Sequence, residues 1–173
     1  MRGTQSKPIG SIIGATAGLA FVLVNAGAVP ASLVWRAAAI VAFFAISWFV
    51  VLRGPAVDHA RPNRQGITVY ALSVAVMILA IPAGAAVLRQ VVDEPDAVPI
   101  WAVFVVGAHF WPFARAFRLP VFAWLSLSLI VVSLLGAIAT ARTSTATASG
   151  WSGVAAGFVL LFFAAIGPRQ PTP

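Results

Sequence analysis

Six long apolar stretches follow one another along this chain, and they constrain its fold more than any other feature. Each has about the 20 residues that a helix needs to cross the hydrocarbon core of a bilayer. Only 9% of the 173 residues are charged and 61% are hydrophobic, whereas a soluble domain has about 25% charged residues. The sequence therefore predicts an all-α, polytopic membrane bundle of six transmembrane helices, with no separate soluble domain.

Basic, acidic and proline-containing segments separate the predicted spans. The spans are expected at residues 9–28, 31–52, 67–88, 98–111 (or 98–117 if the helix continues through Pro112), 119–139 and 151–166. Pro82 predicts a kink in the third span, because proline has no N–H to bond within the helix. The small polar stretch 140–147 predicts a loop, which makes the sixth span the shortest.

The predicted membrane domain comprises residues 9–167, between a polar segment at 1–8 and a tail at 168–173. The tail contains three prolines and is expected to be disordered. The first apolar run also has features of a signal peptide, with Arg2 and Lys7 ahead of it. Its length and its regularly spaced glycines favour a retained first helix.

The charge distribution predicts that both termini lie in the cytoplasm. This orientation places Arg89, Arg142 and the acidic segment 93–96 outside, in agreement with the positive-inside rule. Tryptophans also fall near the predicted span ends, as in interfacial aromatic belts. The basic residues that fall inside are Arg2, Lys7, Arg53, Arg61, Arg64, Arg115, Arg118 and Arg169.

His109 is the one histidine inside a predicted span. On a helix it shares a face with Val105, Pro112 and Phe113. Histidine titrates near neutral pH, and Pro112 leaves the Ala108 carbonyl without its helical donor, so one interpretation is a proton relay or a substrate contact. The other is an uncharged histidine that hydrogen-bonds to a neighbouring helix and fixes the packing. No Asp or Glu lies in any predicted span, which disfavours coupling to protons or sodium through a carboxylate.

Three arginines define two further candidate sites. Arg115 and Arg118, at the inner end of the fourth span, are candidates for binding an anionic lipid or headgroup, or are topological anchors whose side chains extend to the interface. Arg36 lies about one turn into the second span from the outside. Its predicted partners in a structural ion pair are Asp93, Glu94 and Asp96.

Small residues form stripes on three predicted helices. Glycines repeat every fourth residue and predict close helix packing, either within the chain or between the copies of a homodimer. In the fifth span, Ser126 and Ser133 share one face, which would line a polar path or mark a helix contact. The glycines are Gly10, Gly14, Gly18, Gly153 and Gly157.

Enzyme chemistry has little support in the sequence. Cysteine is absent, and no nucleophile with a base, no phosphate-binding loop and no metal-ligand spacing is recognisable. The net charge of +7 lies in loops, so it indicates membrane topology rather than nucleic-acid binding. We expect no cofactor, no metal and no nucleic-acid partner; the partners expected are membrane lipids.

The segment from His109 to Arg118 reads His-Phe-Trp-Pro-Phe-Ala-Arg-Ala-Phe-Arg. It resembles the His-Phe-x-Pro-x-Ala-Arg-x-Phe-Arg segment of uncharacterised small multi-pass membrane proteins of bacteria. The resemblance covers about ten residues of one span and implies a protein of the bacterial cytoplasmic membrane. It implies no catalytic or binding residue.

The function that the sequence favours is a small transporter-like or channel-like module for a neutral or anionic solute or lipid. The alternative, from another class, is a structural or regulatory membrane subunit that acts through helix packing and has no cargo of its own. A water-filled path to His109 or to the serine face would favour transport, whereas His109 packed against a neighbouring helix would favour the structural role.

Overall fold

Six long helices and two short 3-10 turns account for nearly all of the described chain. The structure, a computed structural model, describes residues 9–53, 64–143 and 145–167. Its six long helices are all long and apolar enough to cross a membrane, which confirms the predicted six-span, all-α membrane bundle. The elements are α1 (Ile9–Asn25), η1 (Ala26–Ala28), α2 (Ser32–Arg53), α3 (Arg64–Gln90), η2 (Pro95–Ala97), α4 (Val98–Phe117), α5 (Pro120–Thr143) and α6 (Ala146–Ile166).

Three predicted segments fall mostly or wholly outside the described residues. They are the cytoplasmic segment 1–8, the basic connector between the second and third spans, and the tail 168–173.

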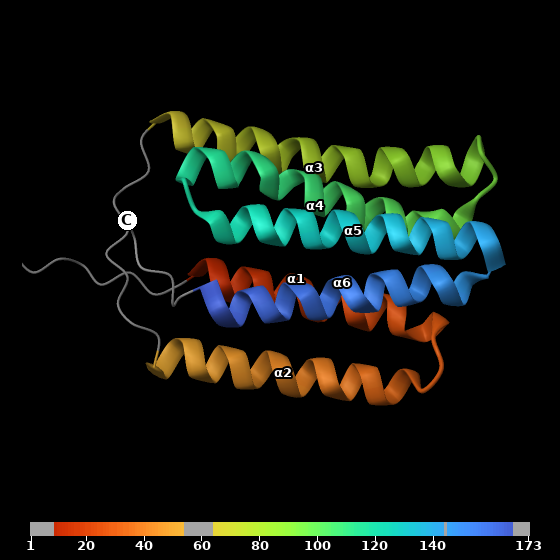
Figure 1. The fold of residues 1–173 in the computed structure, drawn as a ribbon, viewed down its shortest axis with the longest axis horizontal. Helices are drawn as coiled ribbons and strands as arrows, with labels where there is room; N and C mark the ends of the chain where they lie inside the picture. The colour runs from red at the N-terminus through yellow and green to blue at the C-terminus, as the bar shows by residue number, and fades with distance from the viewer. Residues whose placement is uncertain (1–8, 54–63, 144, 168–173) are drawn as a thin grey trace, which may run out of the picture.

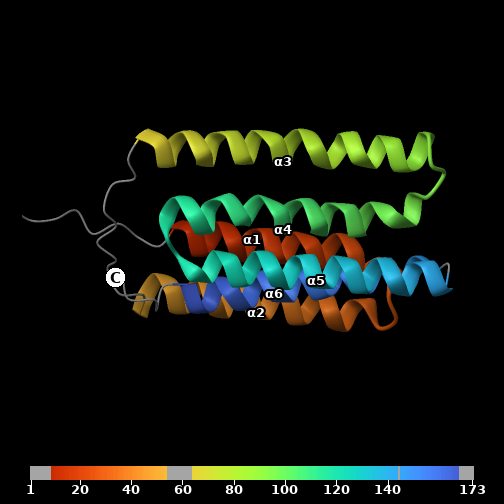
Figure 2. The same ribbon diagram turned by 45° about the horizontal axis from the view of Figure 1, so that its top comes forward.

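The helices run side by side, with α6 near the middle of the bundle and α2 and α3 at opposite edges (Figure 1, Figure 2). α6 packs against α1, α5, α4 and α2, whereas the main helix contact of α3 is with α4. More than half of the α6 span is buried, but no residue of α3 between Ile67 and Gln90 is. Most of the α3 surface is therefore left for lipid.

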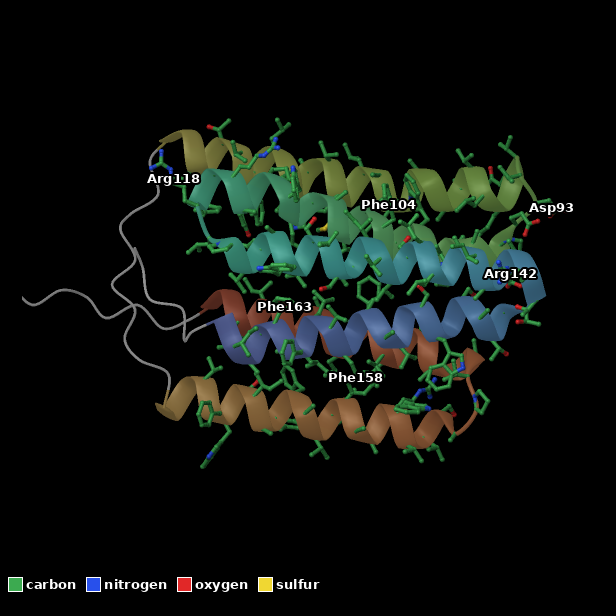
Figure 3. The ribbon with its side chains drawn as sticks, in the orientation of Figure 1. Asp93, Phe104, Arg118, Arg142, Phe158 and Phe163 are labelled. Atoms are coloured by element: carbon green, nitrogen blue, oxygen red, sulfur yellow. The ribbon has the colours of Figure 1, made fainter. Side chains whose placement is uncertain are left out.

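The two ends of the bundle differ in charge. α1 begins and α6 ends at one end, the terminal end, where the α4–α5 connection also lies. The α1–α2, α3–α4 and α5–α6 connections lie at the other end (Figure 1). Figure 3 places Arg118 at the terminal end, with Asp93 and Arg142 at the opposite end. We call the latter the acidic end, because Asp93, Glu94 and Asp96 lie in its α3–α4 connection.

The buried side chains form two clusters that meet at α6. One lies between α1, α2 and α6 and includes Val22, Ala39 and Leu161. The other lies between α4, α5 and α6 and includes Val103, Leu129 and Leu160. α6 directs Phe158 towards the first cluster and Phe163 towards the second (Figure 3). α6 thus joins the two halves of the bundle.

Glycines allow α1 and α6 to approach closely. A Cβ added to Gly18 would lie 2.7 Å from the Gly157 carbonyl oxygen, and one added to Gly157 would lie 2.6 Å from the Gly18 carbonyl oxygen. Such spacing is typical of helices that pack through small residues in membranes. Gly14 faces Ala164, Gly153 faces the Asn25 side chain, and Gly10 has open space beside it. The stripes therefore meet within the chain, except at Gly10.

The boundary between the fifth and sixth spans differs from the predicted one. α5 continues to Thr143 and α6 starts at Ala146, so the expected loop over 140–147 is mostly helix, and α1, not α6, is the shortest of the six long helices. Two hydroxyls bond to carbonyls of their own helix: Thr143 Oγ1 donates to the Ala139 oxygen and Ser149 Oγ to the Ala146 oxygen. The small residues near the start of α6 are buried in helix contacts, so their composition reflects close packing rather than a loop.

Both prolines inside spans are accommodated within continuous helices. α3 runs through Pro82 and α4 through Pro112 to Phe117, which selects the longer of the two predicted ends for the fourth span. Membrane helices tolerate internal proline because neighbouring groups bond to the backbone that it leaves free.

Candidate functional site

His109 is held against α3 by two contacts with a single serine. Its Nδ1 lies 3.1 Å from Ser73 Oγ, and the same Ser73 hydroxyl donates to the His109 carbonyl oxygen at 3.1 Å. Serine has one hydroxyl proton, so when it is given to the carbonyl, Nδ1 must carry the ring proton and donate it to Ser73 Oγ. A neutral ring in this tautomer satisfies both contacts and keeps Nε2 as an acceptor.

Aromatic rings surround the half-buried His109 side chain. The centroids of the Phe113 and Phe110 rings lie 4.5 and 4.8 Å from that of the imidazole. Tyr70 of α3 stacks on Phe113 at 5.3 Å, and Phe122 of α5 stacks on Phe110 at 5.9 Å. The histidine therefore joins three helices through an apolar, aromatic cluster.

Pro112 lies within α4, three residues after His109. The proline has no N–H for the Ala108 carbonyl, which loses its helical donor. The sequence pointed to the Ala108 carbonyl as the extra acceptor, but the outside donor, Ser73, bonds to the next carbonyl along, that of His109.

A second tie holds α3 to α4 near the acidic end. The Trp101 indole Nε1 donates to the Ala80 carbonyl oxygen at 2.9 Å. The Trp101 ring occupies the space beside Gly84, where any side chain would collide with it. Together with Ser73–His109 and Tyr70–Phe113, this contact fixes the position of a helix that has no fully buried residue between Ile67 and Gln90.

The predicted serine face of α5 is directed at neighbouring helices. Ser133 Oγ donates to the Ile100 carbonyl oxygen of α4 at 3.1 Å. Ser152 of α6 donates to the Val132 carbonyl oxygen of α5 at 3.3 Å and lies beside Gly136. Ser126 is fully buried, and its hydroxyl has no hydrogen-bond partner among the described residues.

Arg36 does not meet the acidic connection. Among residues 9–53, 64–143 and 145–167 no ion pair joins it to Asp93, Glu94 or Asp96, and its Nε is buried without a hydrogen-bond partner. The reason lies in the arrangement of the helices: α2 and α3 lie at opposite edges of the bundle, and η2 packs against α3, α4, α5 and α6 (Figure 1). One terminal nitrogen of Arg36 lies 3.4 Å from the position that a Cβ on Gly27 would take.

Arg115 and Arg118 are exposed at the terminal end of α4. The Arg115 guanidinium lies 5.2 Å from the centre of the Trp111 ring, a cation–π distance. Arg118 follows the last helical residue with a left-handed backbone, φ 52°. Both side chains are free to reach lipid headgroups.

Ser73 and Ser152 are the polar residues that the sequence argument missed. Ser73 lies about as far from the start of α3 as His109 lies from the end of α4, so two adjacent antiparallel helices place them at the same depth. This match in depth could have predicted the contact between Ser73 and His109, but only if α3 and α4 were known to be neighbours. Within the described ranges no three His, Cys, Asp or Glu side chains gather as they would around a metal.

No family model, curated protein or solved structure matches this chain. The functional argument therefore rests on the arrangement of its side chains.

Proposed function

We propose that this protein is a structural or regulatory membrane subunit that acts through helix contacts in the bilayer and carries no cargo. The observation that carries this proposal is the double contact between Ser73 and His109. It engages the one histidine in the described spans with a neighbouring helix, as in interhelical packing through polar residues in membranes.

The serine face supports the same proposal. A solute path needs polar groups that face water at the bilayer midplane. Here Ser133 and Ser152 donate to carbonyl oxygens of adjacent helices, and close packing surrounds Gly136. These hydroxyls serve helix association.

The proposed setting is the bacterial cytoplasmic membrane, with both termini in the cytoplasm. The charge distribution and the resemblance of the segment from His109 to Arg118 support it. Membrane lipids are the proposed partners, with Arg115 and Arg118 extending to headgroups. A homodimer would need a surface other than the glycine stripes, because Gly18 and Gly157 are used between α1 and α6.

A transporter-like or channel-like module for a neutral or anionic solute or lipid is the second candidate. One observation favours it: the Ser126 hydroxyl is buried without a partner among the described residues. A buried polar group usually finds a partner, and a passing solute or water would supply one.

Cysteine accessibility separates the two candidates, because the sequence has no cysteine of its own. Ser126→Cys and Ser133→Cys are nearly isosteric and would be treated in membranes with a membrane-impermeant thiol reagent. The structural proposal expects neither to react. Thr143→Cys, at an exposed helix end, is the positive control, and Leu134→Cys, on the exposed apolar surface, is the negative one. Labelling of either serine position at a rate near that of Thr143→Cys would reject the structural role and support transport.

A further inference from the structure

Arg36 carries a positive charge for which the described chain supplies no anion. It lies in α2 close to the start at Ser32, is half-buried, and forms no ion pair among the described residues. Its Nε is enclosed without a partner. A buried or partly buried charge in a membrane protein is normally paired, and none of the described residues supplies the pairing group.

The position of Arg36 along the membrane normal matches the headgroup layer. Four residues of helix rise place its Cα about 6 Å from the start of α2. Side chains on a helix lean towards its N-terminus, and a terminal nitrogen of Arg36 indeed lies next to Gly27 of η1, beyond that start. The guanidinium is thus held at the acidic end, beside the start of the candidate span at Ser32, where a helix of this length is expected to meet the headgroup layer.

Aromatic side chains mark the same depth. The rings of Trp35 and Trp151 meet edge to face at 5.2 Å, and the Trp35 indole donates to the Pro30 carbonyl oxygen at 3.1 Å. Tryptophan is enriched where a membrane protein passes the headgroup layer. The tryptophan pair packs the start of α2 against α6, so the position of Arg36, next to Trp35 in the sequence, is fixed relative to α6.

We propose that Arg36 is the centre of a binding site for the phosphate of an anionic phospholipid. The guanidinium presents paired donors that match phosphate oxygens. The N–H groups of Val34 and Trp35 donate to the Ala31 carbonyl oxygen. Those of Ser32 and Leu33, the first of α2, have no partner within the helix and lie at the same end, where a negative charge is favoured. A lipid suits the site better than a soluble anion does, because α2 lies at the edge of the bundle (Figure 1) and exposes large apolar side chains such as Leu33, Val41 and Phe44.

Lipid titration with native mass spectrometry tests this site. The full chain in an uncharged detergent would be titrated with phosphatidylglycerol, and separately with phosphatidylcholine, whose choline cation competes with arginine for its own phosphate. The site predicts tighter retention of phosphatidylglycerol. Arg36→Met should weaken that retention by at least about tenfold, the loss expected when a charge-assisted hydrogen bond is removed. Arg142→Met is the matched control at the same end and should retain the lipid as the parent does.

A lysine at position 36 and two further experiments distinguish a lipid from the other possible partners of Arg36. Arg36→Lys keeps the charge but not the paired donors, so intermediate retention is expected even if Arg36→Met folds poorly. Equal retention in the parent, Arg36→Met and Arg36→Lys would overturn the site. Displacement of the lipid by millimolar inorganic phosphate would overturn the lipid as occupant in favour of a soluble anion. Restored stability on combining Arg36→Glu with Asp93→Arg would overturn the proposal in favour of an ion pair with the acidic connection.

Discussion

At the scale of single residues, the contact between Ser73 and His109 is stabilising only while both residues keep a hydrogen-bonding group at this depth. Interhelical hydrogen bonds in membrane proteins are worth about 0.6 kcal/mol on average and up to about 1.7 kcal/mol. The Ser73 hydroxyl makes both contacts at this site, so the upper part of that range is expected here. Its removal also leaves the His109 ring without a partner in apolar surroundings.

We predict that Ser73→Ala lowers the free energy of unfolding by about 1–2 kcal/mol. His109→Asn should be tolerated better than His109→Leu, because an asparagine amide can donate from near the position of Nδ1. Reversible unfolding in mixed micelles, followed by circular dichroism, measures each difference. Ser128→Ala is the matched control, since the Ser128 hydroxyl has no hydrogen bond among the described residues. Equal losses for Ser73→Ala and Ser128→Ala would contradict the importance of the contact.

At the scale of the helices, α1 and α6 depend on the absence of side chains at two facing positions. Gly18 and Gly157 each approach the backbone of the other helix, and backbone cannot move aside as a flexible side chain can. An added methyl group must therefore separate the two helices. The separation would disturb both core clusters, because α1 and α6 contribute side chains to each.

We predict that Gly18→Ala lowers the free energy of unfolding by about 1–3 kcal/mol, the usual cost of overfilling a packed contact. Gly10→Ala should change it by no more than about 0.5 kcal/mol, because nothing lies within 4 Å of the position of its Cβ. The same unfolding measurement compares the two variants, which add the same methyl group on the same helix. If Gly10→Ala proved as harmful as Gly18→Ala, close packing with α6 would not be the cause.

At the scale of the whole molecule, the sequence was sufficient to predict the six helices but not which of them are adjacent. Apolar length alone predicts six spans, because a bilayer imposes the same minimum on each. The segment around Thr143 and Ser149 misled the prediction, because small polar residues are typical of both loops and tight helix contacts. No ion pair joins Arg36 to the acidic segment among the described residues. That pairing was predicted from the side of the membrane alone, since sequence does not say which helices are adjacent. Ser73 was missed for the same reason.

The orientation of the bundle is the remaining property that charge predicts for the whole molecule. Six spans place both ends of the membrane domain on one side, and the exposed Arg115 and Arg118 lie at that terminal end, opposite Asp93 (Figure 3). The positive-inside rule predicts that this end faces the cytoplasm. Single cysteines at Arg118 and Thr143 can report it, because the sequence has none of its own.

In intact bacterial cells, Thr143→Cys should react with a membrane-impermeant thiol reagent, and Arg118→Cys should react only after the cells are permeabilised. Seven other basic residues predicted inside remain in Arg118→Cys, from Arg2 and Lys7 to Arg169, so one substitution is not expected to reverse the insertion. Reaction of both variants after permeabilisation controls for thiol reactivity. The reverse pattern would place the acidic end in the cytoplasm and reject the positive-inside assignment. Labelling of both positions in intact cells would contradict the prediction that the terminal end and the acidic end lie on opposite sides of the membrane.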